Sequence, residues 1–191
     1  MSLKAAVGGC VLRLGGWTYE GTVPSERRYV LIAAPHTSNW DFVWMIAMSL
    51  AAGVRLRWMG KASLFDSPLG WLYRALGGIA ARQDVASDLV AQCVHRFTES
   101  EDLVLAVPAE GTRQRAQTWR SGFYHIARLA HVPIVPGYLD YAARRGGLGS
   151  PIHPTGDVGA DMERLRVFYA DKVGRYPDQF TEPSLAEEGR R

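Results

Sequence analysis

A histidine and an aspartate, His36 and Asp41, stand five residues apart in the segment AAPHTSNWDFVWM (residues 33–45). Such a pair can act as a general base, in which the carboxylate holds one imidazole nitrogen and the other nitrogen accepts a proton. Positions five apart on an ideal helix differ by about 140°, so the two side chains could not face one substrate from within a helix. We therefore expect His36 in a turn and Asp41 in the first turn of the helix that follows.

The same segment also has a purely structural interpretation. Ser38 and Asp41 have the spacing of a capping box, in which the two side chains accept hydrogen bonds from backbone N–H groups at a helix start. The helix dipole favours Asp41 at that position, and His36 would then be an ordinary loop residue. The segment alone leaves both interpretations open.

A second polar segment, AEGTRQR (residues 109–115), follows the apolar run DLVLAVP. Gly111 permits close backbone approach, and Arg113 offers a planar fork that matches a phosphate group. As an isolated tetrapeptide, EGTR is more typical of a polar turn with a surface ion pair. Whether Arg113 binds an anion therefore depends on which residues lie near this segment in the fold.

Apolar runs and helical patterns alternate along the chain and must position these residues. Strands are expected at 28–35, 54–60, 79–83, 102–108 and 132–141, and helices at 41–53, 67–78, 86–100, 121–131 and 159–174. This alternation predicts one α/β domain, with a mixed, mostly parallel central sheet flanked by helices. Open sheets of this class usually bind ligands beyond the carboxyl ends of their strands, where His36 is expected.

Length and composition limit the remaining choices. A chain of 191 residues with 47% apolar content can bury one ordinary core. We expect an N-terminal segment at 1–28 that contacts a membrane, a main domain at 29–175, and a polar tail at 176–191 that frays. No apolar run reaches the roughly 18 residues of a membrane-spanning helix, so we expect a soluble or peripheral protein.

Charge and cysteine content limit the partners and the compartment of the protein. The net charge of +3 suits an anionic substrate or membrane surface. The two cysteines, Cys10 and Cys93, have neither the spacing nor the histidine partners of a metal site, and a reducing cytosol is expected. The P-loop pattern and the serine elbow GxSxG are both absent, which argues against P-loop nucleotide binding and an acyl-serine enzyme.

Four blocks together resemble the glycerolipid or lysophospholipid acyltransferases, the family typified by 1-acylglycerol-3-phosphate acyltransferase. In the family's order they are HTSNWD (36–41, the HxxxxD block), GGIAAR (77–82), VPAEGTR (107–113) and VPIVP (132–136). The segment 60–78 between the first two also fits, and the resemblance covers most of residues 29–140. Two features depart from the family pattern: Pro35 replaces a common Asn, and the second block lacks the usual aromatic and acidic residues.

The resemblance implies a glycerol-3-phosphate acyltransferase-like fold and a direct acyl transfer. His36 would remove a proton from the acceptor hydroxyl, with Asp41 as its orienting partner, and no acyl-enzyme would form. Arg113 would hold the acceptor phosphate. The residues implied as further contributors to acceptor binding are Glu110, Gly111, Thr112, Arg82 and Lys61, and backbone N–H groups near 132–136 are a candidate oxyanion site.

The resemblance also implies the partners. The donor would be acyl-CoA or acyl-carrier protein as a co-substrate, without cofactor or metal, and the acceptor an anionic lipid. The protein would be bacterial-type, cytoplasmic and peripheral at the inner face of the membrane, with no nucleic acid partner. Two other classes remain open: a non-catalytic lipid-binding module on the same fold, and a thioesterase-like hydrolase.

Overall fold

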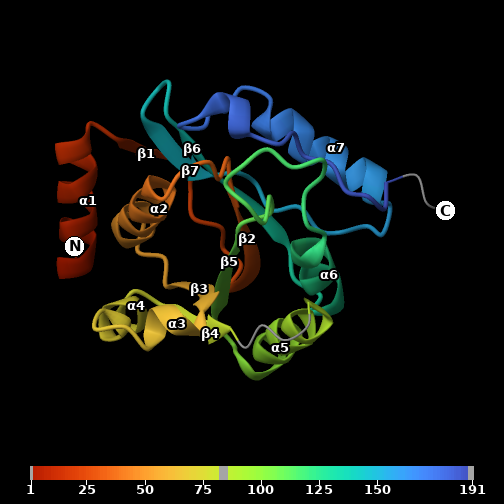
Figure 1. Cartoon of the computed structure of the whole chain (residues 1–191), viewed down its shortest axis with the longest axis horizontal. Helices are drawn as coiled ribbons and strands as arrows, with labels where there is room; N and C mark the ends of the chain where they lie inside the picture. The colour runs from red at the N-terminus through yellow and green to blue at the C-terminus, as the bar shows by residue number, and fades with distance from the viewer. Residues whose placement is uncertain (1, 82–85, 189–191) are drawn as a thin grey trace.

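A seven-stranded sheet runs through the middle of the computed structural model, which describes residues 2–81 and 86–188 (Figure 1). In spatial order the strands are β1 (Thr18–Glu20), β7 (Arg145–Leu148), β6 (Ile134–Asp140), β2 (Arg28–Ala34), β5 (Leu103–Val107), β3 (Leu56–Lys61) and β4 (Gly78–Ala81). Neighbouring strands are parallel, apart from β6 and β7. The expected α/β fold with a mixed, mostly parallel sheet is thereby confirmed.

Helices cover both faces of this sheet (Figure 1). One side carries α1 (Leu3–Gly15), α2 (Trp40–Ala51), α3 (Ala62–Phe65) and α4 (Gly70–Ala75). The other side carries α5 (Ala86–Glu99), α6 (Gly122–Leu129) and α7 (Val158–Tyr169), and a short 3₁₀ turn, η1 (Pro177–Gln179), follows. In the described part of the chain, no helix has both the length and the apolar character needed to cross a bilayer.

The central strand β2 is a continuous apolar run because both of its faces are buried. Val30 and Ile32 point to the core beneath α5, α6 and α7, whereas Tyr29 and Leu31 point to the core beneath α2. Successive residues of a strand alternate between faces, so a strand with helices on both sides must be apolar throughout.

The N-terminal helix α1 was not expected, because its sequence contains several glycines. Two of them are required by packing against α2. A Cβ added at Gly8 would lie 2.5 Å from the backbone nitrogen of Ala51, and one added at Gly15 would lie 2.2 Å from the ring of Trp44. Glycine costs about 1 kcal/mol in a helix, but here it lets the two helices approach closely.

The C-terminal segment was expected to fray, but the structure shows it packed against the domain as far as residue 188, the last one described. Thr181 and Leu185 are both buried. The indole N–H of Trp119 donates to the Thr181 carbonyl at 2.7 Å, and the Ala116 N–H donates to the Thr181 hydroxyl at 2.9 Å. These two hydrogen bonds and the burial of Leu185 therefore fix the segment against the loop that follows β5.

Candidate active site

The carboxyl ends of β2 and β5 bring the two polar motifs together. These strands are parallel neighbours, with Ile32 opposite Val107. His36 follows Ile32 by four residues and Glu110 follows Val107 by three, so both emerge at the same edge of the sheet. The His36 backbone N–H donates to Glu110 Oε1 at 2.6 Å.

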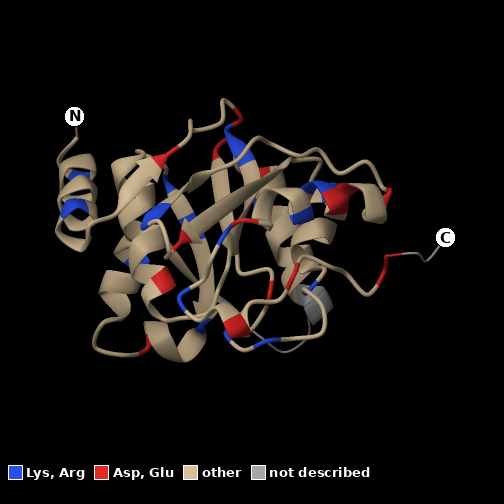
Figure 2. Cartoon of the chain, turned by 90° about the horizontal axis from the view of Figure 1, so that it is seen from above, with Lys and Arg blue, Asp and Glu red and all other residues tan. Residues whose placement is uncertain are grey.

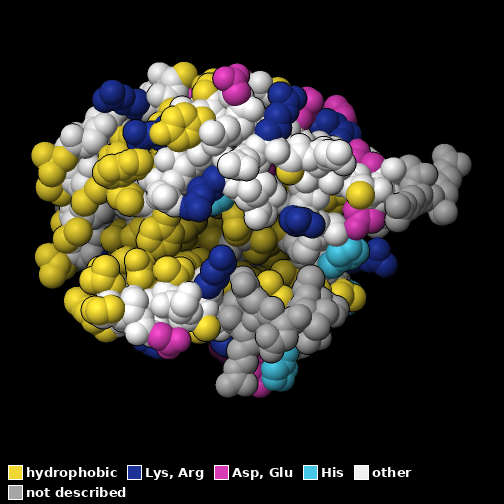
Figure 3. Space-filling view, in the orientation of Figure 1, with side chains coloured by type: hydrophobic (Ala, Val, Ile, Leu, Met, Phe, Trp, Pro, Cys, Tyr) yellow, Lys and Arg dark blue, Asp and Glu magenta, His cyan; other side chains and the backbone are white. Residues whose placement is uncertain are grey.

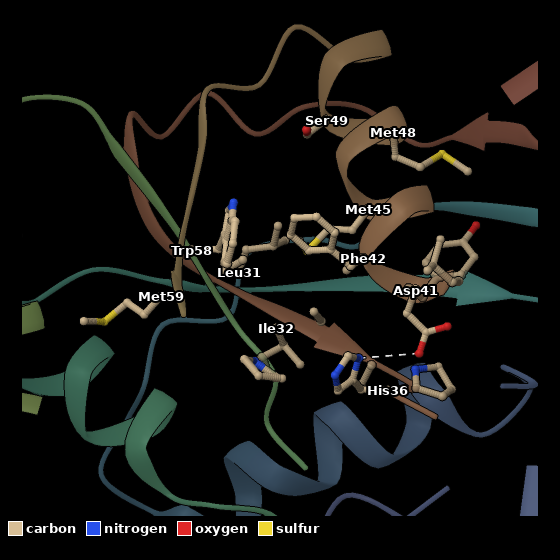
Figure 4. Close-up of a pocket in the computed structure, with 18 of the residues that line it drawn as sticks. Leu31, Ile32, His36, Asp41, Phe42, Met45, Met48, Ser49, Trp58 and Met59 are labelled. Atoms are coloured by element: carbon tan, nitrogen blue, oxygen red, sulfur yellow. Dashed lines mark ion pairs between the residues drawn. The ribbon is translucent and has the colours of Figure 1, made fainter. Parts of the chain in front are cut away.

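The His36 side chain faces the carboxylate of Asp41, which is the arrangement that the first of the two interpretations requires. His36 Nδ1 lies 3.4 Å from Asp41 Oδ2 (Figure 4). The same oxygen accepts hydrogen bonds from the N–H groups of Thr37 and Ser38, both at 2.8 Å. One carboxylate therefore holds the backbone of the turn before α2 and also faces the imidazole.

Burial makes this carboxylate an effective partner for an imidazole. Asp41 is only 4% exposed, whereas the His36 side chain is 24% exposed and can be reached from solvent. Because Asp41 holds Nδ1, Nε2 is the nitrogen that can exchange a proton with a substrate.

Glu110 lies behind His36. It is 1% exposed, and its second oxygen accepts a hydrogen bond from the Thr181 N–H at 3.0 Å. Burial raises the pKa of Glu110 to about 7, although its two backbone donors act in the opposite direction. The sequence named Glu110 as a substrate-binding candidate, but its contacts are those of a residue that fixes the His36 backbone.

A cavity of about 740 Å³ opens beside the His36–Asp41 pair, between α2 and the sheet. Its walls are mainly apolar and include Leu31, Phe42, Met45, Met48, Trp58 and Met59. Its polar lining includes His36, Asn39, Asp41, Lys61, Ser63 and Arg113. Figure 3 shows a hollow lined by hydrophobic side chains with basic side chains at its edge, and Figure 4 shows the His36–Asp41 pair at one end of it.

Arg113 reaches the cavity from the loop after β5. Its guanidinium donates to the side-chain oxygen of Asn39, the residue before α2. Gly111 has a φ of +67°, and a Cβ there would lie 2.6 Å from the side chain of Arg120. The loop therefore requires glycine at 111 in order to turn. The Thr112 hydroxyl accepts a hydrogen bond from the Gln114 N–H at 3.3 Å.

Of the four residues of EGTR, only Arg113 is among the described residues that line the cavity. Lys61, at the end of β3, lines it from the other side. The structure therefore brings His36, Asp41, Lys61 and Arg113 together. Arg82, named from the second block, lies outside the described residues.

The expected oxyanion site at 132–136 is wrong. These residues lie at the start of β6 and before it, away from the edge that carries His36. Val132 N–H donates to Ala127 O and Ile134 N–H to Ile152 O, while Val135 belongs to the β6 ladder with β2. The N–H groups of this block are therefore committed to the fold.

The sequence missed two residues that hold the site. Tyr141, directly after β6, donates its hydroxyl hydrogen to Asp41 Oδ1 at 2.6 Å. Asn39 binds Arg113. The only signal for Tyr141 in the sequence was its position at the end of the expected strand 132–141. Within residues 2–81 and 86–188, no three His, Cys, Asp or Glu side chains gather as a metal site would require.

The Acyltransferase family model matches residues 17–140, more than half of the chain, and the chain belongs to this acyltransferase family. This confirms the resemblance found in its motifs. Comparison with curated proteins gives no match.

Among solved structures, the chain is similar to "Crystal Structure of the 1-acyl-sn-glycerophosphate (LPA) acyltransferase, PlsC, from Thermotoga maritima". The TM-score is 0.62 at 18% sequence identity, and the match covers 87% of this chain and 74% of the other. At this identity the likeness establishes the shared fold.

Proposed function

We propose that this acyltransferase moves a fatty acyl chain from the thioester of acyl-CoA or acyl-carrier protein to the hydroxyl of a lysophospholipid-type acceptor. The observation that carries this proposal is the His36–Asp41 pair at the polar mouth of an apolar cavity whose lining includes Arg113 and Lys61. The base would serve the acceptor hydroxyl, the apolar cavity would hold the acyl chain, and the cations would bind the acceptor phosphate.

In this mechanism, His36 Nε2 takes the proton of the acceptor hydroxyl while the oxygen attacks the thioester carbonyl. The tetrahedral intermediate then collapses, the carbon–sulfur bond breaks, and His36 returns the proton to the leaving thiolate. Asp41 stabilises the imidazolium that exists between these steps. General-base assistance contributes roughly 10² to 10⁴ in rate, and positioning of the two substrates supplies much of the remainder.

The apolar cavity is the proposed site for the acyl chain. Its volume of about 740 Å³ lies within the range of ordinary ligand pockets, and each buried methylene contributes about 0.8 kcal/mol to binding. The reaction needs no cofactor or metal, because the base acts directly on the acceptor hydroxyl.

Arg113 and Lys61 are the proposed contacts for the acceptor phosphate, with Arg82 as a further one. Asn39 holds the Arg113 side chain at the start of α2. In this proposal Glu110, Gly111 and Thr112 shape the loop that presents Arg113. A guanidinium fixed in this way can bind phosphate through two parallel hydrogen bonds.

We further propose that the protein works from the cytoplasm, at the inner face of the membrane. Large apolar side chains face solvent on α1 and α4, including Leu14 (85% exposed) and Trp71 (68% exposed). The α1 helix carries basic but no acidic residues (Figure 2). Exposed apolar side chains with neighbouring cations are typical of a surface that lies on anionic lipid.

The proposal is tested by thiol release from palmitoyl-CoA and palmitoyl-carrier protein, with and without lysophosphatidate or mixed lysolipids. The expected result is release that needs both donor and acceptor, with an acylated acceptor found by mass spectrometry. Release at full rate without acceptor would instead indicate a thioesterase. Lipid binding without any turnover, unchanged in His36→Ala, would indicate a binding module.

A further inference from the structure

The two oxygens of the Asp41 carboxylate have different partners. Oδ2 faces His36 and the N–H groups of Thr37 and Ser38. Oδ1 accepts the hydroxyl hydrogen of Tyr141 at 2.6 Å, the shortest of the contacts to this carboxylate. All of the other contacts come from the loop that carries His36, whereas Tyr141 comes from the end of β6.

Tyr141 is itself held firmly. Its backbone N–H donates to Val173 O at 2.8 Å, and its ring meets Trp17 edge-on with centroids 4.9 Å apart. Burial and the hydrogen bond to Asp41 raise the pKa of the Tyr141 hydroxyl. The hydroxyl therefore stays protonated and remains a donor to the carboxylate at any working pH.

We propose that Tyr141 is a positioning residue for the acyl transfer, which acts through Asp41 to set how strongly His36 holds its proton. This inference rests on the proposed function of the His36–Asp41 pair. The N–H groups of Thr37 and Ser38 keep Oδ2 facing the imidazole, and the hydrogen bond from Tyr141 fixes Oδ1. That hydrogen bond also withdraws negative charge from the oxygen that faces the imidazolium.

The charge that Asp41 presents to His36 decides how loss of the Tyr141 hydroxyl changes the pH dependence of the reaction. Without the Tyr141 hydroxyl, the buried carboxylate loses one donor and carries more negative charge toward His36. The backbone donors still hold Oδ2 in place, so the imidazolium is stabilised and His36 acts as a base only at higher pH. Glu110 lies behind the pair and Arg175 beyond Tyr141. The other charged or titratable residues in the described lining of the same cavity include Lys61, Arg113, Tyr19 and Tyr138.

The test compares Tyr141→Phe with a matched control, Tyr124→Phe. Tyr124 also donates to a buried carboxylate, Asp161 Oδ2, at 2.9 Å, but it lies on α6 in the core on the other side of the sheet. Each variant loses one hydrogen bond from a tyrosine hydroxyl to a buried aspartate, and the bond is part-buried at Tyr141 and buried at Tyr124. A loss of stability alone would therefore affect both variants in the same way.

Two readouts are measured across pH 5 to 9: kcat and KM for acyl transfer, and the rate at which diethyl pyrocarbonate modifies His36, followed by peptide mass spectrometry. The reagent attacks unprotonated imidazole and needs no substrate. In Tyr141→Phe we expect kcat on the acid limb to fall about 3- to 10-fold, with KM within twofold of wild type. The acid limb of both profiles should move up by roughly 0.5 to 1 pH unit. Tyr124→Phe should leave both profiles in place.

The outcomes separate this inference from the proposed function. Profiles of Tyr141→Phe that superimpose on those of wild type would overturn the role of Tyr141, even if wild type transfers acyl chains well. A shifted modification profile in a protein that shows no acyl transfer would support the Tyr141–Asp41–His36 link and refute the proposed reaction.

Discussion

The backbone N–H of His36 donates to Glu110 Oε1 at 2.6 Å, so one buried carboxylate joins the loop that carries the base to the loop that carries Arg113. The other oxygen of Glu110 accepts from the Thr181 N–H. Three segments far apart in the sequence therefore meet on a single side chain. By this contact Glu110 fixes the backbone of His36 relative to both loops.

Glu110→Gln should reduce acyl transfer. A Gln amide keeps the size of the side chain, but its NH₂ group cannot accept a hydrogen bond, so one of the two backbone donors loses its partner. We expect a loss of about 1–3 kcal/mol in the free energy of unfolding and a roughly 10- to 100-fold fall in kcat. Thermal unfolding and steady-state kinetics measure the two effects. Glu182→Gln, at an exposed position nearby, is the control, and equal activity in the two variants would contradict the role of Glu110.

The raised pKa of Glu110 also predicts a pH dependence of stability. Its pKa is about 7 in the folded protein, against an ordinary value of 4.5. Between these values the folded state holds a proton that the unfolded state has released, so stability falls as pH rises from about 4.5 to 7. Relative to Glu110→Gln, wild type should lose about 2–3 kcal/mol across this window and remain level above it. Denaturant unfolding at pH 5, 6, 7 and 8 measures the difference, and parallel curves would refute the expectation.

Arg113→Lys should weaken acceptor binding more than donor binding. Lysine keeps the charge but loses the planar fork that contacts Asn39 and, by our proposal, the acceptor phosphate. The acceptor KM should rise about tenfold while the donor KM changes less than twofold. Arg115→Lys, an exposed arginine two residues away, should behave as wild type. A larger change in the donor KM would assign Arg113 to the donor instead.

Ser49→Phe should shorten the acyl chain that the enzyme accepts. Ser49 lines the cavity from α2, eight residues beyond Asp41 and therefore about 12 Å along the helix axis (Figure 4). A phenyl ring there occupies space that only long chains need. Rates with palmitoyl donors should fall at least tenfold relative to those with octanoyl donors. An unchanged ratio would place the acyl chain elsewhere.

Leu14→Glu should weaken binding to anionic vesicles. Leu14 projects from α1 and is 85% exposed, so a charge there costs little in the folded protein but opposes contact with acyl chains. A matched control is Leu129→Glu, at a 58% exposed position on α6 across the sheet. We expect at least a fivefold loss of vesicle binding for Leu14→Glu in flotation assays. Equal loss in the two variants would argue against a specific membrane-facing side.

Much of this fold could be predicted because its strands are strongly patterned. The apolar runs at β2, β5 and β6 have clear ends, and the ends of β2 and β5 located both His36 and the loop of Arg113. The sequence did not reveal α1 as a helix, because its glycines serve a contact with α2 that only the tertiary structure shows.

The contact between His36 and Asp41 could be expected because the two residues are close in the sequence. Tyr141 lies 100 residues from Asp41, so no local pattern links them, and its contact depends on the pairing of β6 with β2. The oxyanion expectation at 132–136 failed for a related reason. Residues 132–136 lie at the start of β6, whereas His36 follows the end of the parallel strand β2, so the two lie at opposite edges of the sheet. The sequence alone does not give the strand directions that show this.

The most direct test of the central claim is acceptor-dependent thiol release by wild type, His36→Asn and the control His125→Asn. His125 lies on α6, partly exposed and outside the described lining of the cavity. If His36 is the base, His36→Asn should lose at least a hundredfold in kcat, with both KM values near wild type, while His125→Asn keeps full activity. Equal rates of acceptor acylation in wild type and His36→Asn would contradict the account, and the segment PHTSNWD would then be no more than the capped start of α2.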